Sequence, residues 1–306
     1  MQISSTPAVR LAGVTKRFGN HLAVDGLDLE VPAGCIYGFI GPNGSGKTTT
    51  LRILLHIYLP DAGSVEVLGM TGTRAANDKI GYLPEERGLY KKMPVRRLLT
   101  YYAALKGMNR RDTSIAIETW LGRMELSKWI DHRIEELSKG MAQKIQFIAA
   151  VIAQPKLLIL DEPFSGLDPL NLEVLRAAIL DLRRSGTTII FSTHDMRTAE
   201  VMSDFVCMIY KGRKVLDGTL GEIQARYGSD RIRLRLASPG DVISTLPEVH
   251  DFQDLGRYQQ FRYGGDPQQL LITLSNRNRI EFFEVSKPSL HDIFVGIAGA
   301  KEENDA

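Results

Sequence analysis

Hydrophobic and polar residues alternate along much of the first seventy positions of the chain. The alternation is clearest in residues 9–18, 21–31, 35–40 and 63–68, where β-branched residues are frequent. A period of two is typical of strands with one buried face. Residues 8–70 are therefore predicted to form short strands joined by turns.

The pattern changes to helical spacing further along. Apolar residues then recur three and four positions apart, as on one face of a helix. Two short runs between these segments, 157–160 and 187–191, are almost wholly apolar, as in strands buried on both faces. Strand and helix alternate from residue 157 to 205, which predicts an α/β core with right-handed crossovers. The predicted helices are 94–107, 112–125, 139–153, 170–184 and 196–202.

The alternation of strand and helix patterns ends near residue 218, and residues 230–236 alternate basic and apolar positions instead. This change predicts a boundary between a domain of residues 1–218 and a second domain of residues 219–306. The second domain has the predicted order β-α-β-β-α-β, which resembles a ferredoxin-like unit. Pro267 suits the first turn of its second helix. The predicted strands are 230–236, 250–255, 258–263 and 280–285, and the predicted helices are 241–246, 266–276 and 288–297.

Composition is that of an ordinary globular protein. The chain has 306 residues, long enough for two domains, and 43% of them are hydrophobic. It carries 38 Lys and Arg against 36 Asp and Glu, a net charge of +2, so no global charge signal points to nucleic acid. Two cysteines, Cys35 and Cys207, lie far apart in strand-like runs, which favours a reduced cytosolic setting over a disulfide framework.

Neither a membrane-spanning segment nor a secretory signal is predicted. The most apolar stretch, residues 145–160, is interrupted by Gln146, Gln154, Pro155 and Lys156, and the first ten residues lack a continuous apolar region. We therefore expect that a partner brings the chain to any membrane at which it works.

The strongest motif is the glycine-rich segment 41–48, Gly-Pro-Asn-Gly-Ser-Gly-Lys-Thr. It follows an apolar strand and opens a helical stretch, the context that a phosphate-binding loop requires. The backbone N–H groups and the positive end of the helix would hold phosphate oxygens. Lys47 would reach the β- and γ-phosphates and the Thr48 hydroxyl would bind Mg²⁺. The alternative is a glycine turn that precedes Lys-Thr by chance.

Two carboxylates end the buried strand 157–160. Asp161 and Glu162 would lie at the carboxyl edge of an α/β sheet, where ligands bind. Asp161 would hold Mg²⁺ through water, and Glu162 would orient or deprotonate an attacking water. Alternatively, Glu162 only caps the turn that follows it.

Taken together, these motifs resemble the ATP-binding subunit of ATP-binding cassette (ABC) transporters over residues 8–218. Segment 41–48 is similar to the Walker A loop and segment 157–161, followed by Glu162, to Walker B. Segment 165–168 resembles the D-loop, and 193–195 the loop of the switch histidine. Residues 137–141, Leu-Ser-Lys-Gly-Met, stand at the signature position. The resemblance implies an ABC-type P-loop domain with a helical subdomain at 86–135, plus a small α+β C-terminal domain.

The family's residue roles carry over to matching positions. Glu162, His194 and Lys47 would be catalytic. Thr48, Glu85 and Asp161 would bind the metal. The implied nucleotide contacts are Phe18, Gly41, Pro42, Asn43, Gly44, Ser45, Gly46, Lys47, Thr48, Thr49, Ser138 and Gly140.

Four of the matching residues also have plainer interpretations. Phe18 offers a π face to adenine but could be ordinary core. Ser138 and Gly140 open a helix whose donors could reach the γ-phosphate held by a second subunit, or Ser138 could be a simple N-cap. His194 could bind the γ-phosphate or be structural. Asp168 could bridge two subunits or cap a helix that begins at Pro169.

Two departures from the family pattern stand out. The usual signature is Leu-Ser-Gly-Gly-Gln, and here Lys139 and Met141 replace a Gly and the Gln. Glu85 stands where a Gln normally ligates Mg²⁺ and senses the membrane subunit. A carboxylate can also ligate this hard cation. Segment 80–90, the Lys139 variant signature and the ending at 288–294 resemble the sodium- and drug-export branch.

The resemblance implies two ATPs clasped between two nucleotide-binding subunits, as a homodimer or with a close paralogue. Closure would drive transmembrane permease subunits, so the chain would lie at the cytoplasmic face of the inner membrane of a bacterial-type cell. No nucleic-acid partner is expected. Three alternatives stay open: a cassette ATPase acting on ribosomes or DNA, a non-enzymatic regulator, and a phosphate-loop kinase. Arg231, Arg233 and Arg235 could touch nucleic acid or form a solvated strand face.

Overall fold

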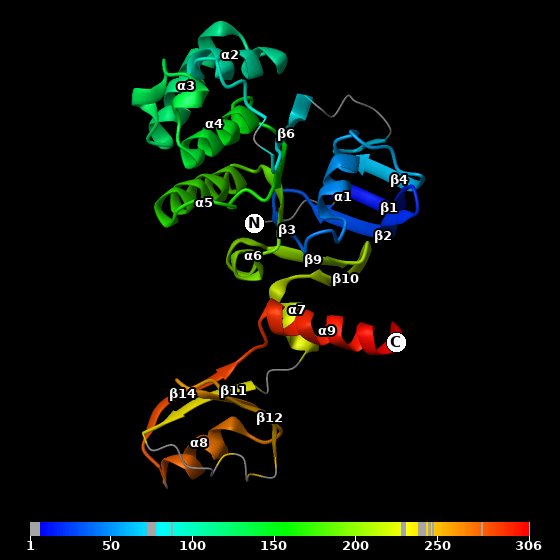
Figure 1. Ribbon diagram of the computed structural model, residues 1–306, viewed down its shortest axis with the longest axis vertical. Helices are drawn as coiled ribbons and strands as arrows, with labels where there is room; N and C mark the ends of the chain where they lie inside the picture. Colours follow the sequence, from blue (N-terminus) through cyan, green and yellow to red (C-terminus); the bar gives the residue numbers. More distant parts are fainter. Residues whose placement is uncertain are drawn as a thin grey trace. The chain divides into compact units, whose positions relative to one another are not determined.

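The computed structural model describes residues 7–71, 78–86, 88–227, 231–237, 243, 246, 248–276 and 278–305. The chain divides into two compact units, Met1–Gly218 and Thr219–Ala306 (Figure 1). Each unit has its own hydrophobic core. No helix of the described residues is long and apolar enough to cross a membrane.

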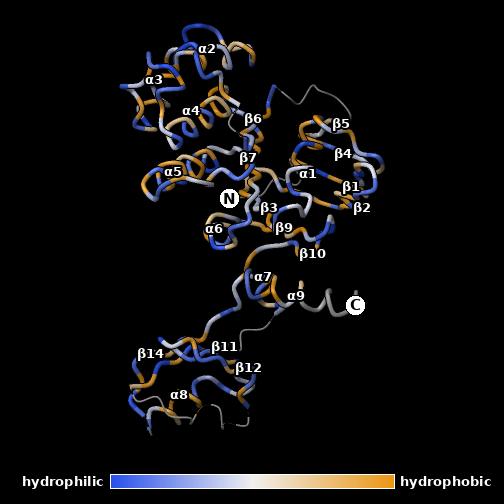
Figure 2. Tube along the Cα trace, viewed as in Figure 1, coloured by the Kyte–Doolittle hydropathy of each residue, from blue (hydrophilic) through white to orange (hydrophobic). Residues whose placement is uncertain are grey.

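An antiparallel sheet of order β2-β1-β4-β5 forms one layer of the first unit. Hydrophobic and hydrophilic residues alternate along its strands, which gives the sheet one buried and one exposed face (Figure 2). The predicted period of two is confirmed here. Its strands are β1 (Pro7–Phe18), β2 (His21–Pro32), β4 (Ala62–Val67) and β5 (Met70–Thr71).

The central sheet has the order β10-β9-β3-β8-β7-β6. Five of its strands run parallel, and β10 is an antiparallel strand at one edge. Every residue of β3, β7 and β8 is buried, as the continuous apolar runs predict. The strands are β3 (Ile36–Ile40), β6 (Ile80–Leu83), β7 (Leu157–Asp161), β8 (Thr188–Thr193), β9 (Phe205–Tyr210) and β10 (Arg213–Gly218).

Helix α1 (Lys47–Leu54) lies in the core between these two sheets. Leu51, Ile53 and Leu54 are buried together with Val14 of β1 and Phe39 of β3. The helix follows β3 after six residues, so the packing of α1 fixes both ends of the intervening loop. The glycine-rich segment is thereby held at the carboxyl edge of the central sheet.

On its other side the central sheet is in contact with α4 (Lys139–Val151), α5 (Pro169–Arg184) and α6 (Met196–Met202), whereas α2 packs on α4 (Figure 1). The Trp120 ring packs edge-on against Phe147, which joins α3 to α4. Segment 86–135, expected to form a helical subdomain, holds α2, α3 and two short 3₁₀ turns at 127–129 and 134–136. The helices are α2 (Val95–Leu105), α3 (Arg110–Arg123), α4 (Lys139–Val151), α5 (Pro169–Arg184) and α6 (Met196–Met202).

The second unit is built on an antiparallel sheet of order β12-β13-β11-β14, with α8 on one face. The third strand lies between the first two, the arrangement of a split βαβ unit, as the ferredoxin-like prediction requires. The elements are α7 (Leu220–Arg226), β11 (Arg231–Leu236), β12 (Val249–Asp254), β13 (Gln259–Tyr263), α8 (Pro267–Ser275), β14 (Ile280–Ser286) and α9 (Leu290–Asp305). The helix predicted at 241–246 lies outside the described residues except for Ile243 and Leu246.

The arginine stripe of β11 is paired within the second unit. Arg231 lies 2.8 Å from Asp292, Arg233 lies 3.5 Å from Glu284, and Arg235 lies 3.0 Å from Glu281. Ion pairs at a partly exposed surface add little stability, but they balance the charge locally. The pairing favours a solvated strand face over a nucleic-acid contact.

Several boundaries differ from the sequence prediction. Helix α3 begins at Arg110 rather than at 112, because the Asn109 side chain caps it by accepting from the Asp112 N–H at 2.9 Å. Strand β8 continues to Thr193, two residues beyond the prediction. The local pattern predicts no strand at 80–83 or 213–218 and no helix at 220–226, where β6, β10 and α7 lie.

Candidate active site

The loop between β3 and α1 is shaped by glycines that no other residue could replace without rearrangement. Gly41 and Gly46 have φ values of 152° and 106°. A Cβ on Gly41 would lie 2.2 Å from the Ile209 carbonyl oxygen, and one on Gly46 would lie 2.4 Å from that of Ala23. The backbone therefore passes closely beneath two neighbouring strands, with α1 opening directly from the loop.

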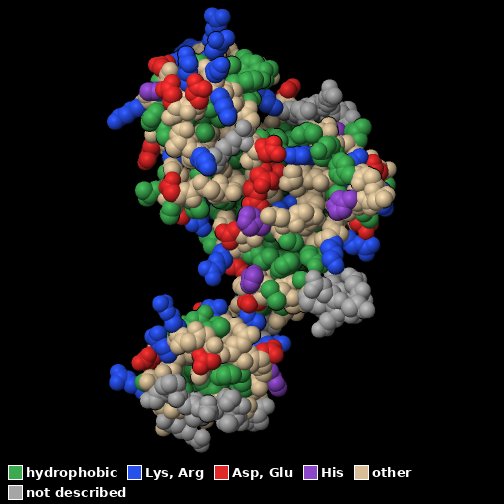
Figure 3. Space-filling view, viewed as in Figure 1, with side chains coloured by type: hydrophobic (Ala, Val, Ile, Leu, Met, Phe, Trp, Pro, Cys, Tyr) green, Lys and Arg blue, Asp and Glu red, His purple; other side chains and the backbone are tan. Residues whose placement is uncertain are grey.

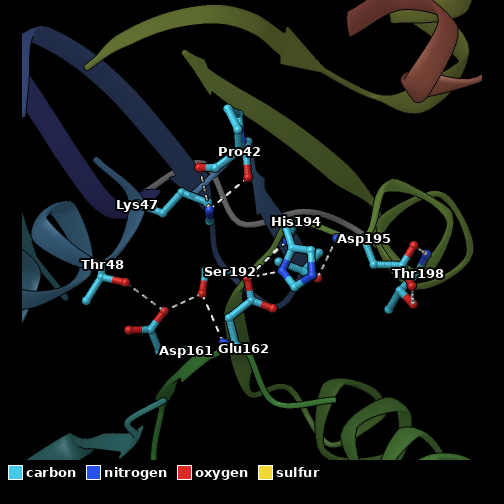
Figure 4. A network of polar contacts seen from close by, with 11 residues as sticks. Pro42, Lys47, Thr48, Asp161, Glu162, Ser192, His194, Asp195 and Thr198 are labelled. Atoms are coloured by element: carbon cyan, nitrogen blue, oxygen red, sulfur yellow. Dashed lines mark hydrogen bonds and ion pairs between the residues drawn. The ribbon is translucent and has the colours of Figure 1, made fainter. Parts of the chain in front are cut away.

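Lys47 folds back over this loop. Its ammonium donates to the carbonyl oxygens of Gly41 at 2.8 Å and Pro42 at 3.1 Å (Figure 4). The side chain is buried, and burial lowers the pKa of its ammonium, while the charges of Glu162, Asp161 and Glu85 oppose that shift. A buried cation on the first residue of a helix is suited to an incoming anion.

Asp161 lies at the end of β7, within reach of the loop. Its Oδ1 accepts from the Thr48 hydroxyl at 3.2 Å and from the Ser192 hydroxyl at 2.5 Å. Its Oδ2 is buried and has no hydrogen-bond partner among the described residues. A buried, unpartnered carboxylate oxygen beside a threonine hydroxyl is an oxygen-rich donor set that fits Mg²⁺. The predicted pair Thr48 and Asp161 is thus together in space.

Glu162 follows in a strained conformation, with φ at 48° and 8% of the residue exposed. Its N–H donates to Ser192, which fixes the turn after β7 against the end of β8. Its Oε1 accepts from the His194 backbone N–H at 3.0 Å and lies 2.9 Å from His194 Nδ1 (Figure 4). Because a carboxylate oxygen is an acceptor, Nδ1 is the protonated ring nitrogen in this contact.

A cavity of about 410 Å³ opens over these groups. Glu85, which follows β6, lines this cavity together with Lys47. On the face seen in Figure 3, acidic side chains gather in the middle of the first unit. The lining residues are Phe18, His21, Ala23, Asn43, Gly44, Ser45, Gly46, Lys47, Thr48, Thr49, Glu85 and Glu162.

Phe18 lies at the rim of this cavity rather than in the core. It is 42% exposed, and its ring packs edge-on against Tyr58 with ring centroids 5.3 Å apart. Lys16 Nζ lies 5.5 Å from the Phe18 ring centroid. An exposed aromatic ring held from the side can stack on a flat base.

Ser138 and Gly140 do not line the cavity. The Ser138 hydroxyl oxygen accepts from the Met141 N–H at 3.2 Å and so caps α4. Asp168 likewise caps α5, accepting from the Asn171 N–H at 3.0 Å. Ser138 and Asp168 are therefore helix caps, as their plainer interpretation predicts.

Sequence reasoning missed several residues that the structure brings to the site. Ser192 bonds both Asp161 and Glu162, and the strand that precedes His194 could have suggested it. His21 and Ala23 line the cavity next to Phe18 because the turn at 19–20 returns the chain to that point. No sequence motif marks them.

Comparison with known proteins agrees with this geometry. The ABC transporter family model matches residues 24–165, and the model of the C-terminal domain of DrrA1-3-like ATP-binding proteins matches residues 218–298. The ABC transporter ATP-binding protein YhaQ of Bacillus subtilis is 43% identical over 95% of this chain and 98% of its own. Nod factor export ATP-binding protein I of Rhizobium sp. strain N33 is 34% identical over 98% of this chain and 99% of its own.

Solved structures give the same result. The ATP-binding subunit of an ABC transporter is 27% identical with a TM-score of 0.69, over 73% of this chain and 94% of that one. The protein cbiO1 of Clostridium perfringens, 22% identical with a TM-score of 0.65, covers 72% of this chain and 92% of its own and shares the fold. The chain therefore belongs to the ATP-binding subunits of ABC transporters, which hydrolyse ATP in the presence of Mg²⁺ and work with separate membrane permeases.

Proposed function

We propose that this subunit powers export of an ion or small molecule, with Glu162 as the general base of ATP hydrolysis. The observation that carries the proposal is the position of Glu162, whose carboxylate is fixed by His194 and lines the same cavity as Lys47 and Thr48. That arrangement places a proton acceptor beside a phosphate site.

The loop and Lys47 would bind the phosphates. On ATP binding, the Lys47 ammonium would exchange the carbonyls of Gly41 and Pro42 for oxygens of the β- and γ-phosphates. The buried Ser45 hydroxyl, which has no partner among the described residues, would donate to the same group. Thr48, Asp161 and Glu85 would hold Mg²⁺, which neutralises phosphate charge when bound. Phe18 would stack on the adenine.

Glu162 and His194 would act on the attacking water. A positioned carboxylate lowers the activation free energy of hydrolysis by accepting the proton of the water as its oxygen attacks the phosphorus. His194 orients Glu162 through two contacts to Oε1, leaving Oε2 to face the water. Because Nδ1 donates to Glu162, the ring would bind a phosphate oxygen only by donating from Nε2, that is, as the imidazolium.

A second nucleotide-binding subunit would complete each site. Ser138 and Gly140 do not line the cavity of their own chain, but they lie at the N-terminus of α4, where the backbone donors favour an anion. Arranged head to tail, each signature would meet the γ-phosphate bound by the other subunit. ATP would favour this closed pair because ADP lacks the γ-phosphate and its contacts.

Export is the direction that the relatives support. The Rhizobium relative is named for Nod factor export, and the C-terminal unit matches that of DrrA-like proteins. We infer a place at the cytoplasmic face of the membrane, where a permease would hold the subunit. ATP-driven closure would then be converted into alternating access of the permease.

Steady-state ATP hydrolysis by Glu162→Gln tests the proposal. The variant should lose about 10²- to 10⁴-fold in turnover, the usual contribution of a general base. Glu118→Gln, which changes an exposed glutamate of α3, is the matched control and should hydrolyse ATP like the wild type. Turnover of Glu162→Gln at the wild-type rate would remove Glu162 from the role.

A further inference from the structure

Helix α4 carries two buried glutamines one turn apart. Gln143 and Gln146 are 7% and 6% exposed. Neither lines the cavity that holds Lys47 and Glu162. Because burying an amide is costly unless it is hydrogen-bonded, what each side chain holds shows why it is there.

Gln146 donates to the carbonyl groups of the two residues that flank Glu85. Its Nε2 lies 3.4 Å from the Pro84 carbonyl oxygen and 3.2 Å from that of Glu86. Gln143 does something different: its Nε2 lies 2.5 Å from the carbonyl oxygen of Pro163, the residue after Glu162. The same helix thus contacts the loops of two different acidic residues.

The loop around Glu85 needs an external support. Residues 84–86 follow β6 without forming a helix or strand of their own. Glu85 is exposed, and it reaches the cavity from this loop rather than from the central sheet. The direction of its carboxylate therefore depends on how the neighbouring residues Pro84 and Glu86 are held.

We propose that Gln146 is the positioning residue of Glu85. By holding the carbonyls of Pro84 and Glu86, its amide keeps the Glu85 carboxylate directed into the cavity, toward the Mg²⁺ position defined by Thr48 and Asp161. This inference rests on the proposed role of Glu85 as a Mg²⁺ ligand. The chemistry requires two donors on one side chain, which glutamine supplies and an apolar residue of similar size does not.

Equilibrium binding of the non-hydrolysable analogue AMP-PNP, measured against free Mg²⁺, separates this role from a structural one. The proteins compared are the wild type, Glu85→Ala, Gln146→Leu and the double variant. Each single variant should raise the half-saturating Mg²⁺ concentration, Gln146→Leu by about 2- to 10-fold, the loss expected for one or two hydrogen bonds. The double variant should match Glu85→Ala alone, because Gln146 acts only through Glu85.

Gln143→Leu is the matched control. It removes an equally buried amide from the same helix, but that amide supports the loop after Glu162. Its effect on the Mg²⁺ midpoint should therefore be the same with and without Glu85, since the two changes are independent. Gln146→Met keeps the side-chain length and replaces Gln146→Leu if circular dichroism shows that the leucine variant is unfolded.

Three results would overturn the inference. If Glu85→Ala shifts the Mg²⁺ midpoint and Gln146→Leu does not, Glu85 is a ligand that Gln146 does not position. If both shift it and the effects multiply in the double variant, Gln146 acts by another route. If Glu85→Ala shifts nothing, the proposed role of Glu85 fails first, and the positioning role falls with it.

Discussion

The residues of the site depart from ordinary rules in ways that suit phosphate chemistry. Glu162 adopts a φ of 48°, which costs of order 1–3 kcal/mol for a residue other than glycine. Asp161 buries a carboxylate oxygen that has no partner among the described residues, and Lys47 buries a cation. A bound phosphate and its cation would offset the two burial costs, which is the expected behaviour of residues arranged for a bound nucleotide.

The assignment of segment 41–48 as the phosphate loop predicts a loss of ATP affinity in Lys47→Ala. The variant should lose ATP binding at micromolar nucleotide, because the ammonium that lines the cavity is removed. Isothermal titration calorimetry measures this directly. Lys156→Ala, an exposed lysine before β7, is the control and should bind ATP normally. Unchanged affinity in Lys47→Ala would refute the assignment of segment 41–48 as the phosphate loop.

Among the elements, local pattern predicted those with strong periodicity or continuous burial. The apolar runs 157–160 and 187–191 predict β7 and β8, because parallel strands covered on both faces need apolar side chains throughout. Strand β10 at the sheet edge has no such signature, and α7 is too short to show a period. These elements are determined by neighbours that the local sequence does not reveal.

Site residues can be predicted where the local sequence alone shows that they follow a buried strand or lie in a glycine-rich loop. Lys47, Thr48, Asp161 and Glu162 lie beside strand ends that the pattern identifies. Gln146 is different, because its importance comes from two carbonyls some sixty positions earlier in the chain. A helical residue among apolar neighbours gives no local sign of a distant hydrogen-bond partner.

The reactivity of the two cysteines tests how well the central sheet is packed. Cys35 precedes β3 and Cys207 lies within β9, and both are buried. Burial, together with the charge of Asp204, raises the pKa of the Cys35 thiol to about 12, and burial raises that of Cys207 well above its ordinary value. Because the thiolate is the reactive form, neither should react with a thiol reagent at pH 8.

The corresponding measurement is a count of reactive thiols with Ellman's reagent. None is expected in the native protein and two in urea, since unfolding restores both exposure and ordinary acidity. Rapid reaction of one thiol in the native state would mean that β3 or β9 is less well covered than the structure indicates.

For the whole molecule, the chain combines an ATP-binding unit with a smaller unit that has its own core. Both tryptophans, Trp120 and Trp129, lie in the first unit, so their fluorescence reports the unfolding of that unit. ATP with Mg²⁺ binds the folded state and should stabilise it by about 2.7 kcal/mol at a concentration one hundred times Kd. The thermal midpoint reported by tryptophan should therefore rise.

Lys47→Ala provides the control, since its midpoint should not respond to ATP. A midpoint that rises equally in the variant would show that the stabilisation comes from binding elsewhere.

The central claim is that two nucleotide-binding subunits clasp ATP between them, and the mass of Glu162→Gln in solution tests it most directly. Light scattering after gel filtration should give a monomer without nucleotide and with ADP, and a dimer with ATP and Mg²⁺, because in the proposed dimer only the γ-phosphate would reach the second subunit's Ser138 and Gly140. A Glu162→Gln protein that binds ATP but stays monomeric at every protein concentration would rule out a homodimer. If the co-purified permease complex also held a single nucleotide-binding subunit, the central claim would be wrong.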